Sequence, residues 1–472
     1  MTLHGMVTGL LLLGLGACSS LPSGLPAGGG VQVPTAWVES AASARSTPLA
    51  RWWLRFNDPL LAALIAEALD ANRSVKSAVA ALRQARALGD VQTAGLGPSL
   101  GLSASAQRNY SGASRSSSNG FRAGLDAGWE PDLFGGQRAG VSAADADTAA
   151  SLASLGDVQV SVAAELALNY LQLRGLQARL LIAQASLASQ QETLQLTDWR
   201  AEAGLVGSLE LEQARAAVAQ TQAQLPALQA AALQTEHAIA VLTGQAPAAL
   251  HGRLVAVERT PQASDDLVLA FPAETLRQRP DVRAAEARVA AAWARMRQAD
   301  AARYPSFQLS GSLGLSSLAL GSLTSGSSVA AGLLGSVSAS LFDGGAARAR
   351  VRAQEAGFDQ VQSTYEATVL AALQEVEDAL VALRHDRERL QYLRAAAESA
   401  QSAALLARQR YSSGLVDFQV VLETQRNALG TQDSVANLLA TLNTDHVRLY
   451  KALGGGWVPD QDNTIRVSPA KP

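Results

Sequence analysis

The chain repeats one series of sequence landmarks twice, with an offset of about 207–210 residues. "GLGPSLGLSAS" aligns with "ARYPSFQLSGS", which places Pro98 and Pro305 in register, and "DLFGG" aligns with "SLFDGG". Further on, "AEAGLVGSLELEQAR" aligns with "YSSGLVDFQVVLETQR", and "IAVLTGQ" aligns with "LYKALGGG". Landmarks that recur in one order over most of a chain indicate a tandem structural repeat. We expect the repeats to span 37–245 and 276–456, with a connection at 246–275.

Each repeat contains two runs in which apolar residues alternate with polar or small ones. In the first repeat both runs lie within about 99–130, and in the second both lie within about 306–342. Each run is about ten residues long, which is the length of a strand that crosses a membrane. A surface hairpin with one wet face would show the same alternation. Two such hairpins at equivalent positions favour membrane strands. Glycine pairs follow each hairpin, where the backbone must turn from sheet to helix.

Long helical segments follow the two hairpins. From about Gln137 to Gly204 the chain has almost no proline and little glycine, and a second helix pattern follows Gly207. The composition agrees, because the chain is 48% hydrophobic but only 5% aromatic, which suits closely packed helices. In the second helix, apolar or small residues step by threes and fours as in a coiled coil: Leu211, Ala214, Val218, Thr221, Leu225, Leu228, Ala232, Thr235, Ile239 and Leu242. We expect Pro226 to bend this helix.

The beginning of the chain resembles a bacterial lipoprotein signal. An apolar run from Val7 to Leu15 is too short to span a bilayer, and "LGAC" then leads to Cys18, the only cysteine. Residues 1–17 are therefore expected to be a signal peptide, and Cys18 is expected to become the lipidated first residue of the mature protein. Residues 18–36 are expected to be a flexible tether, and 457–472 a C-terminal tail. Ser19 after the cysteine favours the outer membrane.

Several function classes find no support in the sequence. The net charge is −3 and no basic run stands out, which gives nucleic-acid binding no electrostatic basis. No phosphate-binding loop is present, and the five histidines are scattered without metal-ligand spacing: His4, His237, His251, His385 and His446. We therefore expect no enzyme activity, no metal site and no cofactor apart from the lipid on Cys18.

The expected strand number implies that copies of the chain associate. Four membrane strands leave two open edges, and each unpaired backbone group in hydrocarbon costs several kcal/mol. Closed barrels begin at about eight strands, and an eight-stranded barrel is filled by its own side chains. The strand face opposite the lipid is polar and includes Arg122, Asp126 and Glu130. A water-filled bore therefore favours three copies, which together would form a 12-stranded barrel, over two.

These motifs together resemble the TolC-like outer-membrane efflux proteins, in particular the lipoprotein branch that serves resistance-nodulation-division pumps. The resemblance rests on the lipobox, "WWLRFNDPLLAALIAEAL", "LRQRPDVRAAEARVAAA", the two "GLV" turns, "VVLETQR" and "LYKALGGGW". It implies a homotrimer with a 12-stranded β-barrel in the outer membrane, continuous with a 12-helix α-barrel in the periplasm. Shorter equatorial elements are implied near 37–70 and 245–275. The implied function is a passive exit duct for drugs or other small molecules.

The resemblance also implies working sites at the helix turns near 204–207 and 414–417. The periplasmic adaptor protein, which links the duct to an inner-membrane pump, is expected to contact the glycines and adjoining apolar residues of both turns: Gly204, Leu205, Val206, Gly414, Leu415 and Val416. The same ends are expected to close the duct at rest through residues that bridge subunits: Arg410, Tyr411, Asp417 and Glu423.

Two other functions remain open at this point. A type I secretion duct for polypeptides would have the same architecture as an efflux duct. A periplasmic coiled-coil lipoprotein without a pore would explain the helices alone.

Overall fold

The computed structural model of the chain describes residues 31–38, 49–113, 115–256, 261–263, 269–270 and 272–458. The predicted signal peptide, Cys18 and most of the predicted tether and tail lie outside the described residues. The described chain forms two compact units. The sheet unit contains Arg83–Ala150 and Ala285–Ala367, and the helix unit contains Gln32–Leu82, Ser151–Ala284 and the chain from Thr368 onward.

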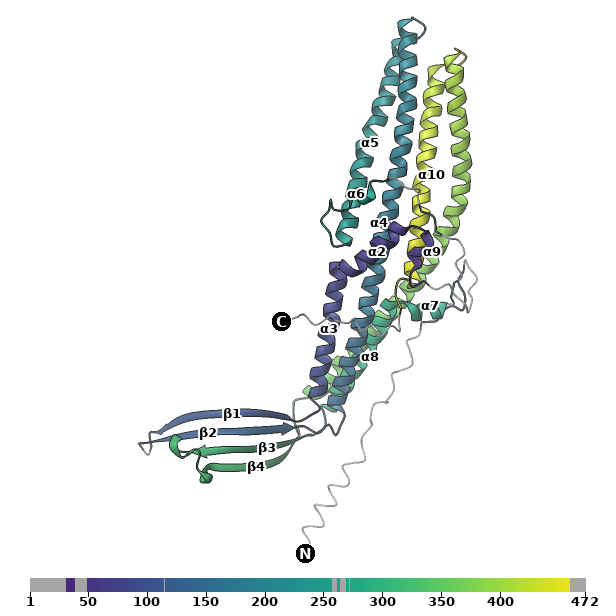
Figure 1. Cartoon of the computed structure of the whole chain (residues 1–472). Coiled ribbons are helices and arrows are strands. Elements are labelled where there is room, and N and C mark those ends of the chain that lie inside the picture. The colour runs from purple at the N-terminus through teal and green to yellow at the C-terminus, as the bar shows by residue number, and fades with distance from the viewer. Residues whose placement is uncertain are drawn as a thin grey trace. The chain divides into compact units, whose positions relative to one another are not determined.

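Figure 1 shows a helix-dominated protein with one four-stranded sheet. The elements follow in this order: η1 (Trp52–Phe56), α2 (Pro59–Ala71), α3 (Arg73–Ala94), β1 (Ser99–Ser111), β2 (Ser116–Trp129), α4 (Gly136–Glu202), α5 (Ser208–Leu242), α6 (His251–Leu254), α7 (Pro272–Gln278), α8 (Pro280–Ala301), β3 (Ser306–Ser317), η2 (Leu320–Ser322), η3 (Gly326–Ser328), β4 (Val329–Ser338), α9 (Ala346–Ser412) and α10 (Phe418–Ala452).

The two halves of the chain form matching series of elements. α4 and α9 each have 67 residues, α5 and α10 each have 35, and α3 and α8 each have 22. β1 and β3 both begin at the residue after a proline, because Pro98 and Pro305 cannot donate a backbone hydrogen bond to a strand ladder. The short elements η1, α2, α6 and α7 lie in the two regions where shorter equatorial elements were expected.

The sheet has the strand order β1-β2-β3-β4, and every neighbouring pair is antiparallel. The register aligns Leu102 with Leu125, Leu125 with Leu313, and Leu313 with Ala331. On the opposite face it aligns Gly101 with Asp126 and Asp126 with Ser312. Since side chains alternate between the two faces along a strand, the alternating apolar residues of all four strands gather on one face.

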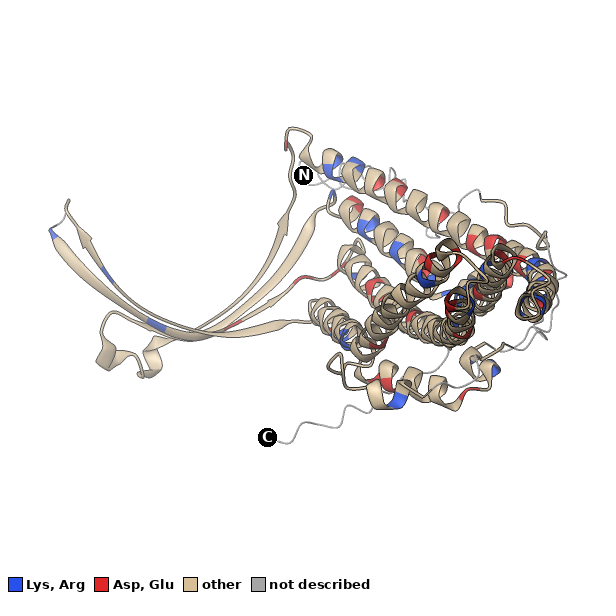
Figure 2. Ribbon diagram, turned by 90° about the horizontal axis from the view of Figure 1, so that it is seen from above, with Lys and Arg blue, Asp and Glu red and all other residues tan. Residues whose placement is uncertain are grey.

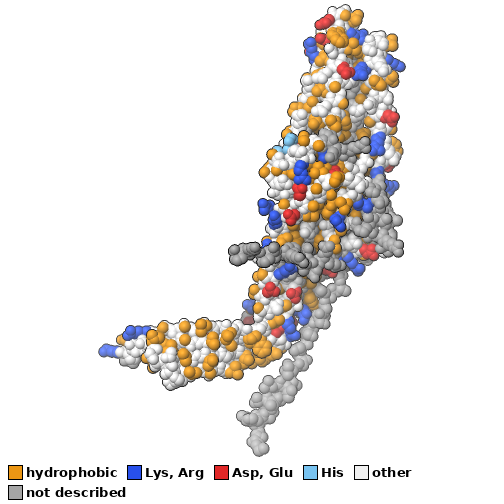
Figure 3. Space-filling model, in the orientation of Figure 1, with side chains coloured by type: hydrophobic (Ala, Val, Ile, Leu, Met, Phe, Trp, Pro, Cys, Tyr) orange, Lys and Arg blue, Asp and Glu red, His pale blue; other side chains and the backbone are white. Residues whose placement is uncertain are grey.

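This apolar face is exposed. The exposed fraction is 82% for Leu102 and 79% for Leu333, and Figure 3 shows hydrophobic side chains spread over the sheet. The face is formed by Leu100, Leu102, Ala104, Ala106, Phe121, Ala123, Leu125, Ala127, Trp129, Phe307, Leu309, Leu313, Leu315, Val329, Ala331, Leu333 and Val337. A continuous exposed apolar area of this kind marks an interaction surface.

β4 is shorter than the sequence pattern predicted. The alternation runs on to Leu341, but β4 ends at Ser338, which pairs with Ser306 at the start of β3. The partner strand β3 begins at Ser306, directly after Pro305. The residues after Ser338 therefore have no strand residue opposite them to pair with. The outer edges of β1 and β4 are unpaired within the described chain.

Glycines with positive φ make the sheet-to-helix junctions, as the sequence predicted. Gly135 has φ +79° before α4, and Gly344 and Gly345 have φ +64° and +89° before α9. An aspartate caps each helix start: Asp132 accepts from the backbone N–H of Arg138 at 2.8 Å, and Asp343 accepts from that of Ala347 at 2.7 Å. Such hydrogen bonds to the charged form lower the pKa of Asp343.

In the helix unit, aromatic residues from both ends of the described chain share one core. Trp52 and Phe56 of η1 pack against Tyr450 of α10, with ring centroids 5.4 and 6.3 Å apart. Gly455 adjoins this cluster, and a Cβ there would lie 2.9 Å from the Trp52 ring. A larger residue at 455 would collide with Trp52, so the turn in "LYKALGGG" needs a glycine where it passes "WWLRF".

Arg279 fixes the same C-terminal turn from the other side. Its side chain is 8% exposed, donates to the carbonyl of Ala452 at 2.9 Å, and binds Asp281 and Glu375 at 2.6 and 2.8 Å. Burial by itself would raise the pKa of Asp281. The hydrogen bonds and the positive charge of Arg279 outweigh burial, so the pKa of Asp281 is lowered. Arg279 therefore ties the "RPDV" motif to the end of α10 and to α9.

A second buried arginine attaches the equatorial segment to α4. Arg174 is 1% exposed and donates to the carbonyl of Ala256 at 2.6 Å and to the Tyr170 hydroxyl at 3.1 Å. Tyr170 in turn donates to Asp58 at the start of α2 at 2.6 Å. Burial of this hydroxyl beside Asp58 raises the pKa of Tyr170.

The predicted seam of α5 faces the protein interior. Ala214, Val218, Thr221 and Ile239 are buried, and the other six seam positions are half-buried. Pro226 lies inside α5, which continues on both sides of it as one helix. α4 is also long and apolar enough to cross a membrane, but 50% of its most apolar stretch is buried within the structure. This burial indicates a packing helix.

Candidate functional site

The α4–α5 and α9–α10 connections are two turns of the same geometry. Gly204 and Gly414 have φ +69° and +74°, a conformation that costs little only for glycine. The backbone N–H of Leu205 donates to the carbonyl of Arg200, and that of Leu415 donates to the carbonyl of Arg410, both at 2.8 Å. This is the hydrogen-bond pattern of a glycine-terminated helix. Each turn therefore holds its next residue in a fixed position.

The residues that the two turns hold in place are solvent-exposed leucines. Leu205 is 68% exposed and Leu415 is 74% exposed, whereas Val206 and Val416 are half-buried beneath them. Val416 packs against a small core formed by residues from both hairpins. The expected adaptor contacts thus divide into exposed leucines, which are free to meet a partner, and valines that support the turns.

Of the four expected gate residues, Tyr411 differs from the others. It is 1% exposed and packs on Phe418, with ring centroids 5.8 Å apart. Its hydroxyl lies 3.3 Å from that of Thr197, and Arg200 stacks over its ring and donates to its backbone carbonyl at 2.5 Å. Tyr411 therefore joins the α4–α5 hairpin to the α9–α10 hairpin of the same chain.

Arg410, Asp417 and Glu423 lie on the exposed surface of the α9–α10 hairpin near its turn. Among the described residues, none of these three side chains forms a hydrogen bond or ion pair. Asp417 is the residue before α10, yet its carboxylate does not cap the helix. The hairpin therefore presents side chains of both charge signs that can form ion pairs with another chain.

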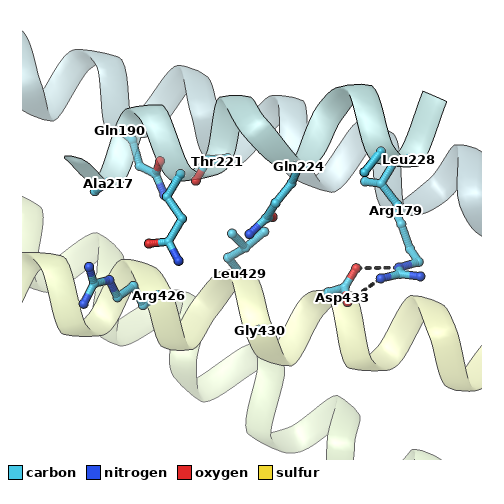
Figure 4. Close-up of a pocket in the computed structure, with 13 residues that line it drawn as sticks. Arg179, Gln190, Ala217, Thr221, Gln224, Leu228, Arg426, Leu429, Gly430 and Asp433 are labelled. Atoms are coloured by element: carbon cyan, nitrogen blue, oxygen red, sulfur yellow. Dashed lines mark hydrogen bonds and ion pairs between the residues drawn. The ribbon is translucent and has the colours of Figure 1, made fainter. Parts of the chain in front are cut away.

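A groove of about 650 Å³ lies between α4, α5 and α10 in the helix unit (Figure 4). Arg179 of α4 binds Asp433 of α10 across it, with Nε–Oδ1 and Nη2–Oδ2 distances of 2.7 and 3.1 Å. Arg426 of α10 also lines the groove and contributes a positive charge there.

The two hairpins meet through a polar seam near their turns. Gln190, Thr193 and Thr197 of α4 are buried, and Gln425 of α10 donates to the Thr193 hydroxyl at 2.9 Å. Neither this seam nor the Arg179–Asp433 pair is among the residues expected from the sequence. The spacing of Gln190, Thr193 and Thr197 could have indicated the seam, because steps of three and four residues place polar side chains on one face of the helix.

A second groove, of about 460 Å³, lies between α9 and α10 and contains Asp445. Asp445 is 2% exposed and accepts from Arg448 at 3.0 Å, while its Oδ2 has no hydrogen-bond partner in the described chain. Burial raises the pKa of Asp445 to about 6; Arg448 acts against this rise, and the nearby Asp386 adds to it. Asp445 therefore holds a proton more tightly in the folded chain than in the unfolded chain.

Changing Asp445→Asn should stabilise the protein at pH 8 and leave it unchanged below about pH 4. A folded pKa of about 6 against an unfolded value of 3.8 means that stability falls as pH rises between these values. Asparagine mimics the protonated side chain, so the variant should gain about 2–3 kcal/mol at pH 8. Urea unfolding followed by circular dichroism at both pH values measures the difference. Asp359→Asn, at an exposed position of α9, is the control. An equal shift of Asp445→Asn at both pH values would contradict the assignment.

The site contains no arrangement suited to catalysis or metal binding among the residues that the structure describes. No group of three or more His, Cys, Asp or Glu side chains there could hold a metal ion. The site instead offers apolar contact, unpaired charge and a polar groove, which are the elements of a protein–protein surface.

Comparison with known proteins identifies relatives over nearly the whole chain. The family model described as "Outer membrane efflux protein" matches residues 64–245 and 271–455. The chain is 32% identical over 474 residues to the pyoverdine export outer membrane protein OpmQ of Pseudomonas aeruginosa, a match that covers 96% of this chain and 97% of that protein. It is 31% identical over 462 residues to the outer membrane protein OprJ of the same organism, with 95% of each chain covered.

Solved structures show the same fold. The outer-membrane channel OprN matches with a TM-score of 0.84 and 36% identity, covering 91% of this chain and 99% of that one. The outer membrane protein VceC of Vibrio cholerae matches with a TM-score of 0.81 and 27% identity, covering 87% and 100%.

Proposed function

The chain belongs to the outer membrane efflux protein family, and we propose that three copies of it form the outer-membrane exit duct of a tripartite efflux pump. It is a channel component and not an enzyme. The observation that carries the proposal is a sheet with one exposed apolar face, one polar face and two open edges.

The sheet can lie in lipid only when its edges are paired. In a bilayer the outer edges of β1 and β4 would leave backbone groups unsatisfied at several kcal/mol each. Pairing β1 of one copy with β4 of the next removes both edges and keeps the apolar face outward. The polar face, with Asp126 bonded to Ser103 at 2.6 Å, then lines the inside.

Three copies account for a wet interior better than two. Two copies would form an eight-stranded barrel filled by side chains, whereas three would form a 12-stranded barrel with room for water. The same symmetry applied to α4, α5, α9 and α10 gives twelve helices in the periplasmic part. The paired lengths of these helices in the two halves support such a ring, because each chain then contributes two equivalent hairpins.

The hairpin turns are suited to receive a periplasmic adaptor. Leu205 and Leu415 present exposed apolar side chains from rigid turns, and such anchors lose little conformational freedom on binding. An inner-membrane pump of the resistance-nodulation-division type would supply the energy. Photo-crosslinkers placed at these two positions should capture the adaptor in cells; absence of adaptor crosslinks would overturn this assignment.

The charged residues near the α9–α10 turn form a resting gate. Arg410 of one copy can pair with Asp417 or Glu423 of another, because all three are exposed and unpaired within the described chain. Tyr411 takes a different part: it holds the two hairpins of one chain together, so that they move as a pair. The polar seam beside it joins the same two hairpins through the hydrogen bond from Gln425 to Thr193, so opening by a shift of each pair of hairpins leaves this bond intact.

Neutralising the gate carboxylates should open the duct and provides the test of the proposed function. The double variant Asp417→Asn/Glu423→Gln should raise the conductance of the protein in planar bilayers at least about fivefold, because each lost ion pair releases up to about 1 kcal/mol and the loss recurs in every copy. Glu398→Gln removes an exposed carboxylate of α9 about 24 Å from the turn and should leave conductance unchanged. A wild-type protein and a double variant that are both silent would contradict a pore.

The cargo is a small molecule. OpmQ is named for pyoverdine export, and full-length similarity to an exporter of that kind favours efflux over polypeptide secretion. A coiled-coil lipoprotein without a pore does not account for the sheet. Restored export of a dye or drug by cells that lack their own duct distinguishes these functions, whereas secretion of a polypeptide substrate alone would favour the alternative.

A lipid on Cys18 completes the proposed outer-membrane attachment, with the chain extending into the periplasm. Cys18 lies outside the described residues, and the proposal rests on the "LGAC" sequence and the preceding apolar run. Mass spectrometry of the mature N-terminus tests it: an unmodified or uncleaved terminus would exclude the anchor.

A further inference from the structure

We propose that the far end of the β1–β2 hairpin binds the phosphate group of an outer-leaflet lipid through Arg108. This inference rests on the proposed membrane-spanning sheet and adds a specific lipid site to it. Figure 3 shows that Lys and Arg side chains gather at the far end of the sheet, beyond its hydrophobic area.

The charges of the sheet are unequally distributed. From Gln107 to Leu125 the chain contains three arginines and no acidic residue, and from Ser306 to Phe342 it contains no charged residue. Figure 2 shows the same distribution, with the blue segments of the sheet toward the hairpin ends and the red ones nearer the helices. The positive charge of the sheet therefore belongs to the first hairpin, and the stretch from Gln107 to Leu125 that carries it has no carboxylate.

Arg108 lies on the apolar face of the sheet. The register pairs Ala106 with Phe121, Arg108 with Asn119 and Tyr110 with Ser117. Because residues of one parity share a face, Arg108 and Tyr110 continue the outward row that begins with Leu100. Arg122 pairs with Ser105 and Ser316 and therefore lies on the polar face.

The distance along the strand places Arg108 at the edge of the hydrocarbon. Its partner Asn119 is ten residues from Trp129, which lies at the opposite end of the apolar face. Ten residues span about 34 Å along a strand, and a tilt of about 40° reduces this to about 26 Å across the membrane. The apolar band of such barrels is about 25 Å tall, so the guanidinium reaches the headgroup layer.

The neighbours of Arg108 form a set of hydrogen-bond donors. Tyr110 is 70% exposed, and Asn119 and Ser117 share the same face. Among the described residues the Arg108 side chain has no hydrogen bond or ion pair. Arginine binds phosphate oxygens through two parallel N–H groups, and hydroxyl and amide groups beside it can donate to the remaining oxygens. An acidic lipid phosphate is therefore the ligand class that this surface suits.

The test compares two variants that lose the same charge from opposite faces. Arg108→Gln and Arg122→Gln are prepared as full-length protein in detergent, and binding of dimyristoylphosphatidylglycerol is followed by native mass spectrometry. Wild type and Arg122→Gln should retain the lipid equally, and Arg108→Gln should bind it about fivefold more weakly. Equal binding by the two variants, or competition by inorganic phosphate as strong as by the lipid, would overturn the site.

Planar-bilayer conductance of Arg108→Gln separates this inference from the proposed duct. A variant that conducts like wild type but loses the lipid supports both proposals. A variant that conducts and keeps the lipid refutes only the phosphate site. Silence of wild type, of Arg108→Gln and of the gate variant Asp417→Asn/Glu423→Gln would refute the duct on which the site depends.

Discussion

Replacing both Leu125 and Leu313 with arginine will prevent the protein from entering lipid bilayers. The two residues are paired in register on adjacent strands and lie near the middle of the apolar face. An arginine at the midplane of a barrel costs about 2–4 kcal/mol, and each copy in the assembly would carry two. We expect the fraction that floats with vesicles in a density gradient to fall to background.

The polar face provides a matched control for this change. Ser310 and Ser312 lie on the same strand as Leu313 but on the opposite face, opposite Gly128 and Asp126. The variant Ser310→Arg/Ser312→Arg adds the same charge to the lining of the bore, and it should float with the vesicles as wild type does. If both double variants floated equally well, the apolar face would not be the lipid face.

Truncating Arg279 to alanine will destabilise the helix unit by about 3–5 kcal/mol, the usual cost of breaking a buried ion pair by removing one partner. The change removes the hydrogen bond to the Ala452 carbonyl and leaves Asp281 without its partner. Urea unfolding of the detergent-solubilised protein, followed by helical circular dichroism, measures the loss.

Arg253 provides the comparison for Arg279. It also binds one carboxylate with two nitrogens, at 3.0 and 2.9 Å from Glu67, but its side chain is 41% exposed. Exposed pairs contribute about 0–1 kcal/mol, so Arg253→Ala should change stability by no more than this. Similar losses for both variants would show that burial of Arg279 does not determine its importance.

Local sequence pattern predicted the elements because each depends on signals close in the chain. The proline-poor segment from Gln137 to Gly204 corresponds to α4, Gly136–Glu202, and the alternating runs correspond to strands that begin at Ser99 and Ser306. The end of β4 was not predictable in this way, because it is set by the first residue of its partner β3.

The roles of side chains at the hairpins were harder to predict from the sequence, because they depend on contacts between residues far apart in the chain. From sequence, Tyr411 was grouped with Arg410 as a gate residue that bridges subunits; in the structure its neighbours are Thr197 and Arg200 of the same chain, more than 200 residues away. Asp433 likewise pairs with Arg179, at a separation of 254 residues. The pattern of apolar residues along one helix predicts whether a residue is buried or exposed. Which residue of a distant helix it contacts depends on how the hairpins pack.

Above all, we propose that copies of the chain share one hollow cylinder that crosses the membrane. Cryo-electron microscopy of the full-length protein in lipid nanodiscs tests it most directly. We expect a threefold axis, β1 of each copy paired with β4 of the next, and lipid density against Leu102 and Leu333. A sheet that lies outside the lipid, or a twofold assembly without a bore, would contradict it.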